Sequence, residues 1–162
     1  MPVLNVFRMF SRMGGRKLSV TSDGAVPLDN MLKRGVREKP DVSAQASRDG
    51  NKLSILAWHY HDDDLPGANA DVTLEFAGLP SSMKGARVKR YVIDAEHSNS
   101  YEVWKKMGSP QKPKPQQYAE LEKSGKLAEL SSAEQIKIGE SGVGSVTFKL
   151  PRQAVTLLVI ER

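Results

Sequence analysis

The chain has 162 residues, of which 39% are hydrophobic, and this length allows one packed domain but not a (β/α)8 barrel, which typically needs about 250 residues. It carries 24 basic and 19 acidic residues for a net charge of +5, and their scattered placement argues against nucleic-acid binding. No cysteine is present, which excludes disulfides, thiol catalysis and cysteine-based zinc sites.

The first residues predict a short amphipathic helix over residues 3–13. Val3, Phe7 and Phe10 lie on its apolar face, and Gly14 and Gly15 follow its end. The apolar run is interrupted by arginines and no run reaches 18 residues, so we expect a soluble chain with no export signal and no membrane contact. The apolar face requires a covering surface, either the domain's own sheet or a separate partner.

From residue 16 onward the apolar residues alternate with polar ones, which is typical of half-buried β-strands. Asp49 and Gly50 stand between two such runs and predict a β-hairpin. A loop near Met31 can hold one helical turn. Strands are predicted over residues 17–21, 42–47, 53–60, 72–76, 87–93, 134–138, 143–150 and 154–160.

Residues 96–130 interrupt the β pattern with an insert of helical character. Ser100 is suited to cap a helix that runs to Met107, and Pro115 to begin a second helix that runs to Lys123. The expected fold is mainly β: an antiparallel β-sandwich of about eight strands with a short N-terminal helix and a helical insert.

His59 and His61 are two residues apart on a predicted strand and should project to the same face. With a carboxylate such as Asp63 they could bind a metal ion, but a third fixed ligand is missing. The favoured interpretation is a strand end whose His and Asp side chains hydrogen-bond within a loop or line a cleft. No metal and no cofactor are expected.

The acidic run Asp62–Asp64 raises the question of a carboxylate pair for glycoside hydrolysis. Such a pair must face across a sugar at a separation of about 5 to 9.5 Å. Neighbouring loop residues rarely hold that geometry, so a solvated turn or a calcium-binding loop is favoured. No catalytic residue is assigned.

The insert carries four side chains suited to carbohydrate: His97, Asn99, Tyr101 and Trp104. Aromatic faces stack on pyranose rings, while amide and imidazole groups bond to hydroxyls. Tyr101 and Trp104 are three residues apart, so they share a helix face and could equally form part of the core.

Four separated segments resemble, in order, the C-terminal β-sandwich of glycoside hydrolase family 39, the β-xylosidases and α-L-iduronidases. They are Leu4–Phe10, Trp58–Asp64, His97–Tyr118 and Leu150–Leu158. The resemblance implies that residues 1–15 correspond to the last helix of a catalytic barrel absent from this chain. Residues 16–162 then form an accessory sandwich whose insert, residues 96–130, reaches the catalytic mouth.

The resemblance further implies that His97, Asn99, Tyr101 and Trp104 shape the rim of a xylan- or xylo-oligosaccharide-degrading site. Both catalytic glutamates of the family lie on the barrel, so we expect this chain alone to be inactive and its partner to be a (β/α)8 barrel. Two alternatives remain: an independent carbohydrate-binding module, or a structural or assembly domain whose first helix is covered by a partner.

Overall fold

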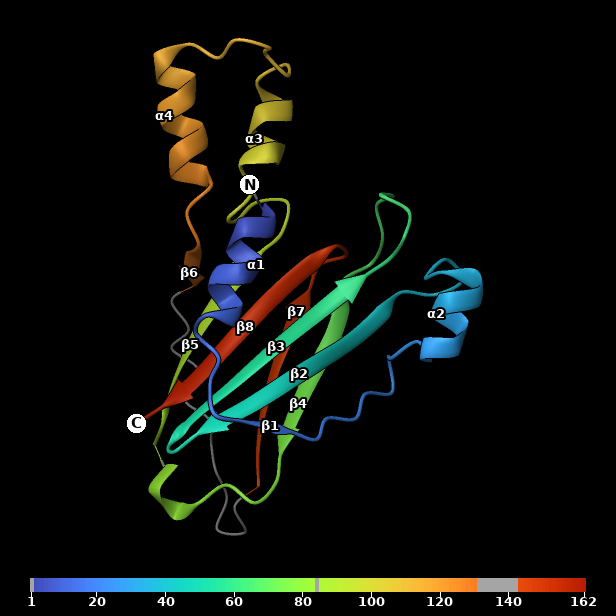
Figure 1. The fold of residues 1–162 in the computed structure, drawn as a ribbon, viewed down its shortest axis with the longest axis vertical. Helices are drawn as coiled ribbons and strands as arrows, with labels where there is room; N and C mark the ends of the chain where they lie inside the picture. The colour runs from blue at the N-terminus through green and yellow to red at the C-terminus, as the bar shows by residue number, and fades with distance from the viewer. Residues whose placement is uncertain (1, 84, 131–142) are drawn as a thin grey trace.

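The computed structural model describes residues 2–83, 85–130 and 143–162 as two packed antiparallel sheets with four helices (Figure 1). The larger sheet has the order β1-β2-β3-β8-β5-β6, and β4 pairs with β7 in the smaller one. The strands are Arg16–Leu18 (β1), Asp41–Asp49 (β2), Lys52–Tyr60 (β3), Ala70–Phe76 (β4), Arg87–Ile93 (β5), Ala128–Leu130 (β6), Gly144–Leu150 (β7) and Ala154–Glu161 (β8). The predicted mainly-β antiparallel sandwich is confirmed.

The helices are Pro2–Phe10 (α1), Leu28–Arg34 (α2), Ser100–Lys106 (α3) and Pro115–Ser124 (α4), with a 3-10 turn at Ser81–Met83. Three details of the prediction are wrong. The first helix ends at Phe10 rather than at residue 13, and the first strand ends at Leu18 rather than at residue 21. Asn99, not Ser100, caps α3. The predicted strand over residues 134–138 lies outside the described residues.

The predicted hairpin is present as β2 and β3, which pair in register from Asp41 opposite Tyr60 to Asp49 opposite Lys52. Gly50 and Asn51 form the connection, and Gly50 adopts a positive φ of 55°. A two-residue turn whose twist matches that of the strands favours such a backbone conformation. The turn thus sets which side chains of β3 point to each face of the larger sheet.

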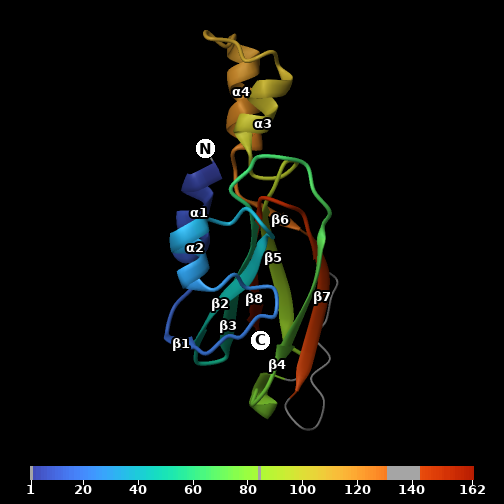
Figure 2. The same cartoon turned by 90° about the vertical axis from the view of Figure 1, so that its right-hand side faces the viewer.

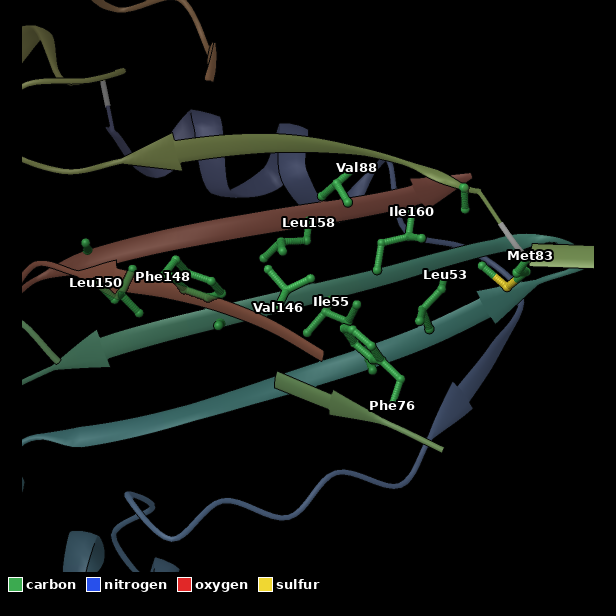
Figure 3. Packing of buried hydrophobic residues seen from close by; sticks show 14 residues of the cluster. Leu53, Ile55, Phe76, Met83, Val88, Val146, Phe148, Leu150, Leu158 and Ile160 are labelled. Carbon is green, nitrogen blue, oxygen red and sulfur yellow. The ribbon is translucent and has the colours of Figure 1, made fainter. Parts of the chain in front are cut away.

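The main core lies between the two sheets (Figure 3). Leu53 and Ile55 of β3 and Leu158 of β8 point from the larger sheet toward Val146 and Phe148 of β7. All five side chains are at most 6% exposed. Because strand side chains alternate between faces, the residues between them point to the other side of the sheet.

That other side packs against α1, which lies across the sheet on the face away from β4 and β7 (Figure 2). Met9 of α1 is fully buried against Leu56, Tyr91 and Leu157. β3 and β8 are therefore covered on both faces, which explains why most residues of these two strands are buried.

The helices α3 and α4 form a hairpin that extends beyond the end of the sandwich (Figure 1). Its base is fixed to α1 by Asn5, whose side-chain amide donates to the carbonyl oxygens of Ser98 (2.9 Å) and Gly125 (3.0 Å). β6 follows the hairpin and returns the chain to the edge of β5, with Val92 opposite Ala128. The insert therefore begins and ends at neighbouring positions.

Candidate functional site

The base of the hairpin is a tight turn that contains His97, the first of the predicted rim residues. The carboxylate of Asp94 accepts the backbone N–H groups of Glu96 (2.8 Å) and His97 (2.7 Å). It also lies 3.0 Å from His97 Nδ1. The imidazole ring is thereby held in one orientation at the surface, with 36% of the side chain exposed.

Asn99 has a structural role at the start of α3. Its Oδ1 accepts the backbone N–H of Glu102, and its Nδ2 donates to the carbonyl of Asp94 over 2.9 Å. The side chain therefore caps the helix and at the same time joins it to the preceding turn. Both functional groups of the amide are engaged in these contacts.

Tyr101 and Trp104 form an aromatic pair on α3, with ring centroids 5.7 Å apart and planes 24° from parallel. Trp104 Nε1 donates to the carbonyl of Pro110 over 3.1 Å, which fixes the indole against the segment that joins α3 to α4. Tyr101 remains 52% exposed. The predicted pair thus shares a face, and that face is not part of the buried core.

The aromatic pair has a cationic neighbour that the sequence analysis missed. Lys105 Nζ lies 5.0 Å from the centre of the Tyr101 ring and 2.6 Å from a carboxylate oxygen of Glu102. The hydrogen bond that the Lys105 ammonium donates to the Glu102 carboxylate raises the pKa of Lys105. The i,i+4 spacing from Tyr101 to Lys105 is the sequence signal that indicates this contact.

Together, Tyr101, Lys105 and Glu102 present an aromatic face with a cation and a carboxylate beside it. Such a set can stack on an apolar sugar face while the charged groups bond to hydroxyls. Tyr118 of α4 is 63% exposed, so both helices of the hairpin display an aromatic side chain. His97 and Asn99 lie at the base of the same hairpin and orient it.

His59 and His61 are both buried, and both rings bind backbone carbonyl groups. His59 Nδ1 lies 3.0 Å from the carbonyl oxygen of Leu150 in β7. His61 Nε2 lies 2.9 Å from that of Arg37, and its Nδ1 accepts the backbone N–H of Asp63 over 3.0 Å. These contacts fit the predicted hydrogen-bonded strand end. Within the described ranges no three His, Asp or Glu side chains converge on a metal position.

The acidic loop that follows β3 is organised around Asp62. The backbone N–H of Val36 donates to Asp62 Oδ2 over 2.9 Å, and this bond lowers the pKa of the carboxyl group. A further bond from the Tyr60 hydroxyl acts in the same direction and raises the pKa of Tyr60. Arg37 lies 3.6 Å away. Asp62 therefore connects the end of β3 to the segment after α2.

The outer face of α1 is apolar and exposed over its whole length. Four side chains stand out with exposed fractions of 43–65%: Val3, Leu4, Phe7 and Phe10. The helix α2 lies on the same side of the larger sheet as α1 (Figure 2). Its residues Leu28 and Leu32 are also exposed. A shallow hollow of about 260 Å³ lies where β3 ends and β8 begins, between Trp58, Tyr60 and Val155. No helix in the described part of the chain is long and apolar enough to cross a membrane.

Residues 1–135 match the family model of glycosyl hydrolases family 39. The chain therefore belongs to this family, as its sequence segments indicate.

Solved structures of family 39 enzymes share the fold. The enzyme from Xanthomonas axonopodis pv. citri is 15% identical with a TM-score of 0.71, and the match covers 99% of this chain and 30% of that one. A bacterial orthologue of human α-L-iduronidase is 23% identical (TM-score 0.70; 99% and 27%). A monomeric β-xylosidase from Caulobacter crescentus CB15 is 18% identical (TM-score 0.59; 97% and 30%). The chain thus spans about 30% of the length of the enzymes that it matches.

Proposed function

We propose that residues 1–162 are the accessory β-sandwich of a β-xylosidase-like glycoside hydrolase that acts on xylo-oligosaccharides. In this proposal residues 1–15 dock on a catalytic (β/α)8 barrel, and the insert over residues 96–130 shapes the rim of its active site. The sandwich positions the substrate, while the barrel supplies the carboxylates that break the glycosidic bond.

The observation that carries the proposal is the uncovered apolar face of α1. Phe7 is 65% exposed and Val3 is 56% exposed, in a helix whose opposite side anchors the core through Met9. A contiguous apolar surface of this kind marks an interaction site. The matched enzymes are about three times as long as this chain, which provides ample sequence for a partner domain.

The position of the hairpin supports the rim role. α1 and the hairpin share the Asn5 contacts to Ser98 and Gly125, so a partner that docks on α1 lies close to the hairpin base. Tyr101 and Lys105 lie further along the same hairpin, on α3. Their aromatic and charged groups suit a pyranose ring and its hydroxyls.

The test is hydrolysis of an aryl β-xyloside by residues 1–162, by a separately produced family 39 barrel, and by the mixture. We expect activity only in the presence of the barrel, with an increase when the sandwich is added. Phe7→Lys should abolish the increase, while Leu65→Lys, at an exposed loop site 62% accessible to solvent, should retain it. Hydrolysis by residues 1–162 alone would refute the accessory role.

A second candidate is an independent carbohydrate-binding module, and the exposure of Tyr101 and Tyr118 favours it. This candidate predicts that residues 1–162 bind xylan without a barrel and that Tyr101→Ala weakens binding. Affinity electrophoresis in xylan-containing gels measures this directly. A structural or assembly domain instead predicts a dimer on a sizing column that is indifferent to sugar, with α1 covered by its copy.

A further inference from the structure

The smaller sheet is narrower than the sheet it covers, and an open groove runs along one side of the sandwich as a result. In the described part of the chain, β4 pairs with β7 alone, whereas the larger sheet has six strands. The groove lies between β4 and residues 20–23 and has a volume of about 810 Å³. A further hollow of about 240 Å³ continues it toward Leu18 and Leu79.

The edge of β4 that pairs with no strand in the described part of the chain borders this groove. Its lining includes the residues from Asp71 to Ala77 and, among the described residues, none from β7. Backbone N–H and C=O groups alternate between the two edges of a strand, so the edge away from β7 retains its own set. The seven residues of β4 therefore offer about 24 Å of strand edge for pairing.

Small side chains form the floor of the groove. Ala44 of β2 and Ala57 of β3 line it from the larger sheet. Val72 and Leu74 of β4 point toward the core from the smaller sheet, and both are only partly buried. Since neighbouring strands lie about 4.8 Å apart, a strand added beside β4 would cover the floor over β2. One added strand would therefore be wide enough to cover this floor.

The charge of the groove is opposite to that of the chain. Asp23, Asp71 and Glu75 line the groove, and neither hollow is lined by a lysine or arginine from the described ranges. The chain as a whole has a net charge of +5. Asp71 is paired with Lys149 of β7 at 2.6 Å, so Glu75 and Asp23 carry most of the unbalanced charge. Basic side chains on an added strand would be attracted here.

We propose that this groove receives one further β-strand from a polypeptide segment outside residues 1–162, with alternating apolar and basic side chains. The apolar side chains face Ala44 and Ala57, and the basic ones lie beside Glu75 on the outer surface. Main-chain pairing with β4 supplies affinity, and the alternating side chains supply specificity. The groove lies on the opposite side of the larger sheet from α1, so this inference is independent of docking through α1.

The first test is calorimetric titration of residues 1–162 with the peptide Ac-Lys-Val-Lys-Val-Lys-Val-Lys-NH2. Two matched peptides carry N-methyl groups on the valines or on the lysines, and each therefore lacks the N–H donors of one strand edge. We expect the parent peptide to bind, and at least one methylated peptide to bind tenfold or more weakly. Hydrogen exchange of residues 70–76 should slow on binding. Absence of binding, or equal binding of all three peptides, would overturn the proposal.

Variants of the chain locate the site. Ala44→Phe fills the floor and should weaken peptide binding at least tenfold, and Glu75→Lys should weaken it and reduce its salt dependence. Glu122→Lys, at an exposed position of α4, is the matched charge control and should bind as the parent does. Circular dichroism verifies folding, and Glu75→Lys decides the test if Ala44→Phe does not fold.

Two outcomes of the variant experiment count against a donated strand. Equal peptide binding by the parent chain and by both groove variants would show that the lysines bind the surface without using the groove. A dimer of residues 1–162 that dissociates on Ala44→Phe would assign the groove to a second copy of the chain. Analytical ultracentrifugation of the parent and the variant distinguishes this case.

Discussion

The buried side-chain amide of Asn5 donates to the backbone carbonyl of Ser98 across 2.9 Å, so the first helix is joined to the start of the helical hairpin. Ser98 in turn donates its hydroxyl to the carbonyl of Val92 and accepts the N–H of Ala128. One short hydrogen-bond network therefore connects α1, the end of β5, and β6. The orientation of the hairpin relative to the sandwich depends on it.

Replacing Asn5 by alanine should loosen the hairpin. The carbonyl groups of Ser98 and Gly125 lose their donor at a site from which water is excluded, which costs about 1–3 kcal/mol in the free energy of unfolding. Hydrogen exchange of residues 98–128 should accelerate more than that of β3. Asn30→Ala, at an exposed position of α2, is the control and should change stability by less than about 0.5 kcal/mol. Equal effects of the two changes would argue against the network.

Tyr101→Ala should weaken substrate binding by the complemented enzyme of the proposed function. An aromatic contact of this kind is worth about 0.5–1.5 kcal/mol, which corresponds to a rise of about two- to tenfold in KM. The value of kcat should change little, because in the proposed arrangement Tyr101 contacts the sugar at the rim and not at the bond that is cleaved. Tyr101→Phe preserves the ring and should preserve KM. An effect on kcat alone would contradict a rim role.

The stability contributed by Asp62 should depend on pH. Because the bond from Val36 lowers the pKa of Asp62 in the folded state, this contribution is complete above about pH 5 and is lost as the pH falls through the folded-state pKa. Asp62→Asn should therefore lower the free energy of unfolding at about pH 7, and the difference from the parent should shrink toward about pH 2. Urea unfolding at the two pH values measures it. Gln116→Ala, at an exposed uncharged position of α4, is the control and should differ from the parent by the same amount at both pH values.

Gly15 and Gly50 provide a matched pair of glycine-to-alanine changes. Both adopt positive φ values, 74° and 55°, but a side chain at Gly15 would collide with the backbone of Arg48, whereas Gly50 faces open space. Gly50→Ala should cost about 1 kcal/mol from backbone strain alone. Gly15→Ala should lower the melting temperature clearly more. Similar melting temperatures for the two variants would mean that the segment before β1 shifts without cost.

Much of the sandwich was predictable because the information is local. The Asp49-Gly50 pair marks the turn of the β2–β3 hairpin, and alternation of apolar residues marks β4 and β5 within two residues of their observed ends. The cap of α3 was placed one residue late, at Ser100, although Asn99 precedes Glu102 at the spacing of a capping residue and its acceptor. The sequence therefore contained the information that places the cap of α3 at Asn99.

Other features depend on contacts between distant residues and could not be predicted. β6 has three residues and is a strand because it pairs with β5, with Arg90 opposite Leu130. The role of Asn5 depends on Ser98 and Gly125, which are 93 and 120 residues away. His59 was identified as a loop or cleft residue, but its partner, the carbonyl of Leu150, belongs to the opposite sheet.

The pairing of Val92 with Ala128 places the two ends of the helical hairpin on adjacent strands. The pairing of β5 with β6 therefore closes the loop that carries the helices at its base. Lengthening or exchanging that segment changes how far the hairpin projects while the strands stay as they are. The hairpin is thus an interchangeable part, through which one scaffold can be adapted to neighbours of different shape.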